Sequence, residues 1–117
     1  MRPTIYISGP VTRGNKLRNY YRFCDAFEKL IAMGFAPMNP GQSIVHPGAF
    51  EIPHETWLEI DIPWVLSADC VLRLQGSSAG ADKECEAARL HGIPTFESLT
   101  EAEAWLKLNA IRKNATS

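Results

Sequence analysis

The chain has 117 residues, of which 45% are hydrophobic and 21% charged, and its formal net charge is −1. This composition is typical of one globular domain, and the small charge argues against a large electrostatic surface for DNA or RNA. The three cysteines lack metal-ligand spacing, and no segment is apolar enough for a signal peptide or a membrane span. We therefore expect a single domain over residues 1–117 in a reducing cytoplasm. We expect no cofactor, no metal, and no nucleic-acid or membrane partner.

The first third of the chain alternates short apolar segments with an amphipathic one. Residues 4–7 are apolar and β-branched, which predicts a buried strand. Residues 15–33 place apolar side chains at helical spacing and are followed by a glycine, which predicts a helix and its end. Residues 35–38 predict a second strand, at a sheet edge because Pro37 has no N–H to donate. The Gly- and Pro-rich residues 39–53 predict a long binding loop.

The alternation continues through the rest of the chain. Further elements are predicted at residues 54–67 (helix), 69–74 (strand), 80–91 (helix), 93–96 (strand) and 100–111 (helix). Pro63 lies inside the first of these helices and is expected to kink or split it. Thr100 is expected to cap the last helix, with Glu103 completing a capping box, before a frayed tail.

Strands that alternate with helices predict a fold of the α/β class. We expect a small doubly wound, flavodoxin-like or Rossmann-like parallel sheet of four or five strands, with helices on both faces. In such sheets, ligands bind beyond the carboxyl ends of the strands, where the strand order reverses. The first and third strands should flank that point, so the turns at residues 8–14 and 75–80 should face each other across a pocket.

The first of these turns begins Ser8-Gly9-Pro10 and continues to Arg13 and Gly14. Glycines let the backbone approach a ligand closely, and backbone N–H groups together with Arg13 can hold a phosphate. The alternative is an ordinary turn between strand and helix, with a solvated arginine.

The second turn opens a helix with the small residues Ser78 and Gly80. A helix N-terminus is a favourable site for an anion, and Ser78 could both cap the helix and touch a phosphate. Glu84 lies about one turn further on, where its carboxylate could point back into the pocket. The alternative for Glu84 is that it only complements the helix dipole, which is the expectation for Asp82.

Two further acidic residues and two histidines lie near these turns. Asp61 is either a surface group or a proton donor in the pocket, and Asp69 is expected to bind turn backbone. His46 and His54 flank the long loop, where contact with a ligand is one alternative. Cys85 lies beside the expected pocket but has no obvious activating base.

Taken together, several motifs resemble a known family over roughly residues 4–96. They are TIYISGP at residues 4–10, Asn39-Pro40, Trp57 with Asp61, Asp69-Cys70, and SAGA at residues 78–81 with Glu84. This combination resembles a compact branch, associated with phages and bacteria, of the nucleoside 2-deoxyribosyltransferase superfamily. The resemblance implies that Glu84 is a nucleophile toward the anomeric carbon of a sugar. It also implies that Asp61 assists departure of the base and that Tyr6 orients the nucleophile.

With a serine at position 78, the chain resembles the branch of this superfamily that cleaves nucleoside 5′-monophosphates rather than free nucleosides. The resemblance then implies a substrate site for a small-molecule nucleotide, with a phosphate cradle. The expected cradle is Gly9, Arg13, Ser78 and Gly80, and the expected substrate- or phosphate-binding residues also include Ser8, Pro10 and Asn39. The expected function is that of an N-glycosidase; the alternatives are a deoxyribosyltransferase, a hydrolase of another N-glycoside, and a non-catalytic nucleotide-binding module. Because the pocket is open on one side, we expect a homodimer or higher homo-oligomer to close it.

Overall fold

The computed structural model of the protein describes residues 1–11, 13–38 and 51–116, with side chains described as far as residue 110. Within these ranges the chain forms one sheet of four parallel strands in the order β2-β1-β3-β4. The strands are β1 (Thr4–Ser8), β2 (Ala36–Met38), β3 (Cys70–Arg73) and β4 (Thr95–Phe96). This arrangement confirms the predicted α/β fold, with β1 and β3 side by side. It also confirms that the strand containing Pro37 lies at an edge.

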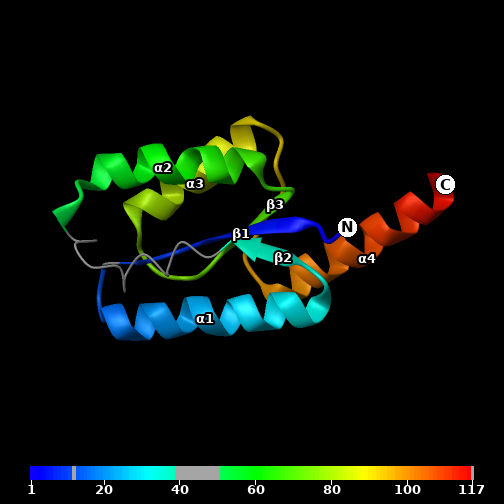
Figure 1. The fold of residues 1–117 in the computed structure, drawn as a ribbon, viewed down its shortest axis with the longest axis horizontal. Coiled ribbons are helices and arrows are strands. Elements are labelled where there is room, and N and C mark those ends of the chain that lie inside the picture. The colour runs from blue at the N-terminus through cyan, green and yellow to red at the C-terminus, as the bar shows by residue number, and fades with distance from the viewer. Residues whose placement is uncertain (12, 39–50, 117) are drawn as a thin grey trace.

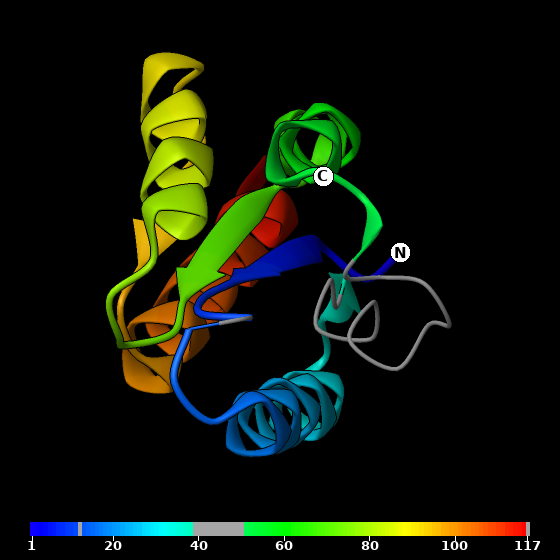
Figure 2. The same cartoon turned by 90° about the vertical axis from the view of Figure 1, so that its left-hand side faces the viewer.

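Four helices cover the sheet: α1 (Lys16–Met33), α2 (His54–Ser67), α3 (Ala79–Leu90) and α4 (Leu99–Thr116). Figure 1 shows α2 and α3 on one side of the sheet and α1 on the other, and Figure 2 shows the same layers from the end. The beginning of α4 packs on the same side as α1, and its later turns extend beyond the sheet (Figure 1). None of these helices, over the described residues, is both long enough and apolar enough to cross a membrane.

Strand β1 supplies side chains to two separate cores because successive residues of a strand point to opposite faces. Ile5 and Ile7 pack against α1 and α4, in a cluster that includes the fully buried Phe23 and Leu30. Tyr6 points the other way, into a smaller cluster with residues of α2, β3 and α3. The polar groups of the candidate site lie on this second side.

The ends of two helices differ from the predictions. The hydroxyl of Ser98, rather than that of Thr100, accepts a hydrogen bond from the Glu101 N–H at 3.2 Å and so caps α4. Glu103 is not part of a capping box, because it pairs with Lys107 one turn later. The cap lies earlier because β4 ends at Phe96 and the chain turns into the helix at once.

Of the two outcomes expected at Pro63, a kink or a split, the split does not occur, and the expected frayed tail is wrong. Helix α2 continues through Pro63 over its whole range, and α4 continues to Thr116. A proline removes one helical hydrogen bond, but the packing of α2 against α3 can hold the helix together on both sides of it. The Trp105 ring of α4 stacks on Phe35 and contacts Phe96, which fixes the first half of this helix against the sheet.

Candidate active site

Glu84 is the buried carboxylate at the centre of the candidate site. Its side chain projects from the second turn of α3 and only 6% of the residue is exposed. The Tyr6 hydroxyl donates a hydrogen bond to Oε2 at 2.6 Å, and the Ser8 hydroxyl donates one to Oε1 at 2.8 Å. The two donors stand two residues apart on β1, which places both on the face of the strand that looks toward α3. Both oxygens of the carboxylate are thus held by hydroxyl groups from one strand.

The electrostatic environment of Glu84 is set mainly by burial. Burial raises the pKa of its carboxyl, while the bonds from Tyr6 and Ser8 and the more distant charge of Arg73 oppose that rise. In the described part of the chain no Lys, Arg or His lies within ion-pair distance of Glu84. The carboxylate therefore depends on hydrogen bonds rather than on a counter-ion for its stabilisation.

Asp61 is a second carboxyl group whose charge interacts with this centre. It lies half-buried on α2, a helix that packs against α3. Burial and, after it, the charge of Glu84 raise the pKa of Asp61 to about 7. The pKa of Tyr6 is raised above its ordinary value by burial and by Glu84, with a smaller effect from Asp61. At neutral pH the tyrosine therefore keeps the proton that it donates to Glu84, whereas Asp61 is close to half-protonated.

The N-terminus of α3 lies one turn before Glu84. The Ser78 hydroxyl accepts a hydrogen bond from the Ala81 N–H at 3.1 Å and caps the helix, as predicted for its capping role. Gly80 faces the ring of His54 at the start of α2, and a Cβ built on this glycine would lie 3.1 Å from the His54 Cε1 atom. The charge of His54 also contributes to lowering the pKa of Glu84. His54 therefore lies beside the candidate site.

The two turns predicted to face each other do so. Gly76 of the β3–α3 connection, at φ +124°, packs so closely on Pro10 that a Cβ there would lie 2.7 Å from the proline Cγ. Gly9 packs on the side chain of Leu74, whose Cβ would lie 2.9 Å from a Cβ at Gly9. Close packing of the two turns therefore requires glycine at both positions 9 and 76, whether or not a ligand is bound.

The remaining predicted residues are placed as follows. The Ser8 hydroxyl, expected at a phosphate, is fully buried and bonded to Glu84. Arg13 is exposed, and its carbonyl accepts a hydrogen bond from the Asn19 amide at 2.7 Å. Asn39 and His46 lie outside the described residues. Asp69 accepts a hydrogen bond from the Thr4 N–H at 2.8 Å, which agrees with the structural role expected for it.

Sequence reasoning missed Arg73 and Asn19. The Arg73 guanidinium bonds to Asp82 at 3.1 Å and to the carbonyls of Gly76 and Leu74, so it organises the turn that leads into α3. A positive residue at the last position of a strand flanking the switch point was the available signal. Asn19 is buried and ties down the β1–α1 turn through the carbonyls of Val11 and Arg13. No group of three or more metal-ligating side chains occurs among the described residues.

Two comparisons with known proteins bear on identity. A comparison with curated proteins found no match. Residues 3–96 match the profile of the family described as "Domain of unknown function (DUF4406)". This match covers the whole sheet and every described residue of the candidate site. The chain therefore belongs to the DUF4406 family.

Proposed function

We propose that this protein is a nucleoside 5′-monophosphate N-glycosidase in which Glu84 is the nucleophile. The observation that carries the proposal is the buried carboxylate of Glu84, held by the Tyr6 and Ser8 hydroxyls without an ion-pair partner in the described part of the chain. Keeping a carboxylate in such a place lowers the stability of the folded state, and groups of this kind cluster at functional sites. The resemblance to the nucleoside 2-deoxyribosyltransferase superfamily supports the same role for Glu84.

The reaction then has two steps. Glu84 attacks the anomeric carbon of the sugar as the bond from that carbon to the base breaks, and the bond's electron pair leaves with the base nitrogen. Asp61, with a pKa of about 7, supplies the proton that this nitrogen takes up. Water next attacks the anomeric carbon, its proton returns to Asp61, and the Glu84 carboxylate is released. The products are the free base and the sugar 5-phosphate.

Tyr6 and Ser8 act on the nucleophile in this scheme. Their hydrogen bonds fix the direction of both carboxylate oxygens, so Glu84 can attack without first searching among rotamers. They also stabilise its charged form against the cost of burial, which keeps a fraction of the carboxyl ionised. We therefore assign Ser8 to positioning Glu84, rather than to the phosphate.

The proposed phosphate position is the N-terminus of α3. Ser78 already caps this helix, and Gly80 leaves room beside His54 where a side chain would crowd the ring. A negative side chain at position 78 would repel a phosphate, whereas the serine and the positive end of the helix dipole favour it.

We also propose that the protein forms a homodimer through α2. Ile60, Trp64 and Leu66 of this helix are 44%, 55% and 37% exposed. Large exposed apolar side chains gathered on one helix are typical of a protein–protein interface. Analytical ultracentrifugation should find a dimer at micromolar concentration, and Trp64→Glu should shift it to a monomer; a monomeric unsubstituted protein would contradict this proposal.

The test of the enzyme is release of free base from a panel of ribo- and deoxyribonucleoside 5′-monophosphates, followed by chromatography. Glu84→Gln keeps the shape and two polar partners for the hydroxyls but removes the nucleophile. We expect it to lower base release about a thousandfold or more. Supplying a second free base separates the two reaction types, because a transferase would form a new nucleotide.

The matched control is Glu86→Gln, two residues further along α3 and exposed. It removes the same charge from the same helix and should leave base release unchanged. If Glu84→Gln releases base as fast as the unsubstituted protein, Glu84 is not the nucleophile. If no monophosphate is cleaved but one raises the melting temperature, the site is a binding site without this activity.

A further inference from the structure

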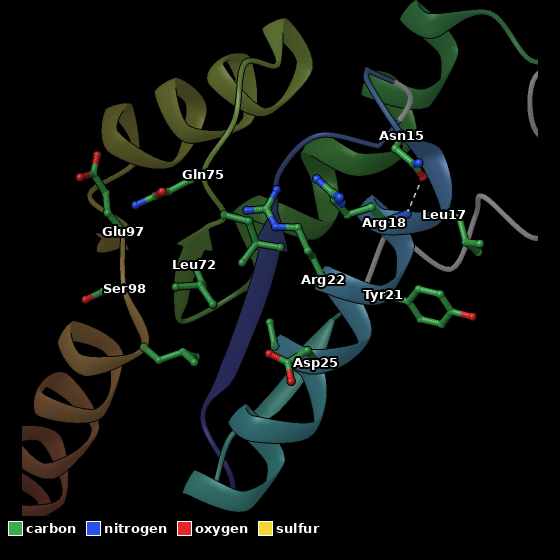
Figure 3. A pocket seen from close by; sticks show the side chains of 13 residues that line it. Asn15, Leu17, Arg18, Tyr21, Arg22, Asp25, Leu72, Gln75, Glu97 and Ser98 are labelled. Atoms are coloured by element: carbon green, nitrogen blue, oxygen red, sulfur yellow. Dashed lines mark hydrogen bonds between the residues drawn. The ribbon is translucent and has the colours of Figure 1, made fainter.

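A cavity opens on the other side of the sheet from Glu84. Its volume is about 700 Å³, within the range of small-molecule sites. It lies between the first turns of α1, the end of β3 and the connection from β4 to α4, as Figure 3 shows. Leu72, which lines it, belongs to the core on the α1 side, whereas Tyr6 belongs to the core on the α2 side. The cavity is thus separate from the candidate active site.

The cavity carries two arginines. Arg18 and Arg22 are one helical turn apart on α1, and neither guanidinium has a hydrogen bond or ion pair within the described part of the chain. Figure 3 shows both guanidinium groups on the side of α1 that looks toward the β3–α3 connection. Arg22 Nη1 would lie 3.8 Å from a Cβ built on Gly76, which places this group against that connection.

The polar neighbours of the arginines do not neutralise them. Asp25 is engaged with Lys29 at 2.9 Å, and the Asn15 side chain accepts the Arg18 N–H as the cap of α1. The carboxylate of Glu97 lies at the opposite wall and points away from the arginines (Figure 3). Two like charges one turn apart repel each other, so an anion between them is favoured.

The other walls are partly apolar. Leu74 and Leu99 line the cavity, together with the polar Gln75 and Ser98. Two guanidinium forks match the charge and geometry of a phosphate monoester, and the two leucines match an apolar body attached to it. We propose that this cavity binds a small organic phosphate monoester. Its phosphate lies between Arg18 and Arg22, and its apolar part lies against Leu74 and Leu99.

The proposal is independent of the proposed enzyme activity, and its test uses phenyl phosphate as the probe. Isothermal titration of the unsubstituted protein should show binding that is tighter for phenyl phosphate than for inorganic phosphate or phenol alone. The double variant Arg18→Gln/Arg22→Gln should weaken it by about tenfold or more, because each lost guanidinium removes a charge-assisted hydrogen bond. Added salt should weaken binding to the unsubstituted protein as well.

Two controls separate this cavity from other sites. Lys83→Gln/Arg89→Gln removes the same charge from exposed positions on α3 and should bind phenyl phosphate as before. Ser78→Asp blocks the proposed phosphate position of the active site and should also retain binding. Loss of binding in Ser78→Asp together with retention in the Arg18/Arg22 variant would overturn the proposal, as would absence of binding at millimolar phenyl phosphate.

A measurement without substitutions covers the case in which the double variant fails to fold. The Nε–H resonances of Arg18 and Arg22 in the unsubstituted protein should shift on addition of phenyl phosphate, while that of Arg89 stays in place. Unmoved Arg18 and Arg22 resonances at a saturating concentration would reject the site.

Discussion

The two faces of the sheet are built from the same strand but bury different chemistry. On the α1 side, Ile5 and Ile7 of β1 pack into a wholly apolar cluster. On the α2 side, Tyr6 and Ser8 of β1 bury their hydroxyls against Glu84. Burial of apolar side chains on the α1 side stabilises the fold, whereas burial of the Glu84 carboxylate on the α2 side costs desolvation free energy that hydrogen bonds offset. The α1 side thus holds the larger apolar core, whereas the α2 side holds the buried carboxylate on which the proposed reaction depends.

The largest effect on stability is expected on the apolar face. Phe23 is fully buried there, and Phe23→Ala should lower the free energy of unfolding by about 3–5 kcal/mol, because it removes buried area and leaves a cavity. Chemical denaturation measures the change. Tyr21→Ala, on the same helix but 61% exposed, should change stability by less than about 0.5 kcal/mol. Equal losses in the two variants would contradict this view of the α1 side.

A smaller effect, with a distinctive pH dependence, is expected on the face that holds Glu84. Tyr6→Phe removes the hydrogen bond to Oε2 and should destabilise the fold by about 1.5–3 kcal/mol while Glu84 is ionised. The loss should be larger at pH 8 than at pH 4.5, because the missing donor stabilises the charged carboxylate more than the neutral acid. Denaturation of both proteins at the two pH values measures this difference, and a loss independent of pH would mean that the bond does not act on a charged Glu84.

The smallest effect concerns Asp61, which the fold holds at a pKa of about 7 against an ordinary value of 3.8. The folded state therefore binds this proton more tightly than the unfolded state, and its contribution to stability is lost as pH rises from about 4 to about 7. Asp61→Asn cannot titrate and should flatten this decline by about 1 kcal/mol, after allowance for partial exposure. Glu59→Gln, exposed on the same helix, should leave the decline unchanged. The denaturation midpoints of the unsubstituted protein and of both variants should be measured across this pH range. If the midpoints of all three proteins change with pH in parallel, the raised pKa is not that of Asp61.

Much of the fold could be predicted from the sequence because its signals are local. The helix ranges depend on apolar spacing and on caps such as Asn15 and Gly34, which act within one or two turns. The edge position of β2 follows from Pro37, which has no N–H for a neighbouring strand. The sequence does not determine which residue caps α4, because Ser98 and Thr100 are both suitable. The end of β4 at Phe96 decides in favour of Ser98.

The candidate site could be predicted only in part, because its residues come from distant parts of the sequence. The alternation of strands and helices by itself determined a parallel sheet, the pairing of β1 with β3, and the meeting of two turns at the carboxyl edge. Glu84 and Tyr6 could be nominated from motifs, but they are 78 residues apart, and only the tertiary structure decided that both hydroxyls of β1 meet one carboxylate. The arginine-lined cavity is likewise decided by tertiary structure, because it joins α1 to the β4–α4 connection. Hydrogen bonds and burial depend on positions in space, and a sequence pattern reports only the neighbours that a residue has along the chain.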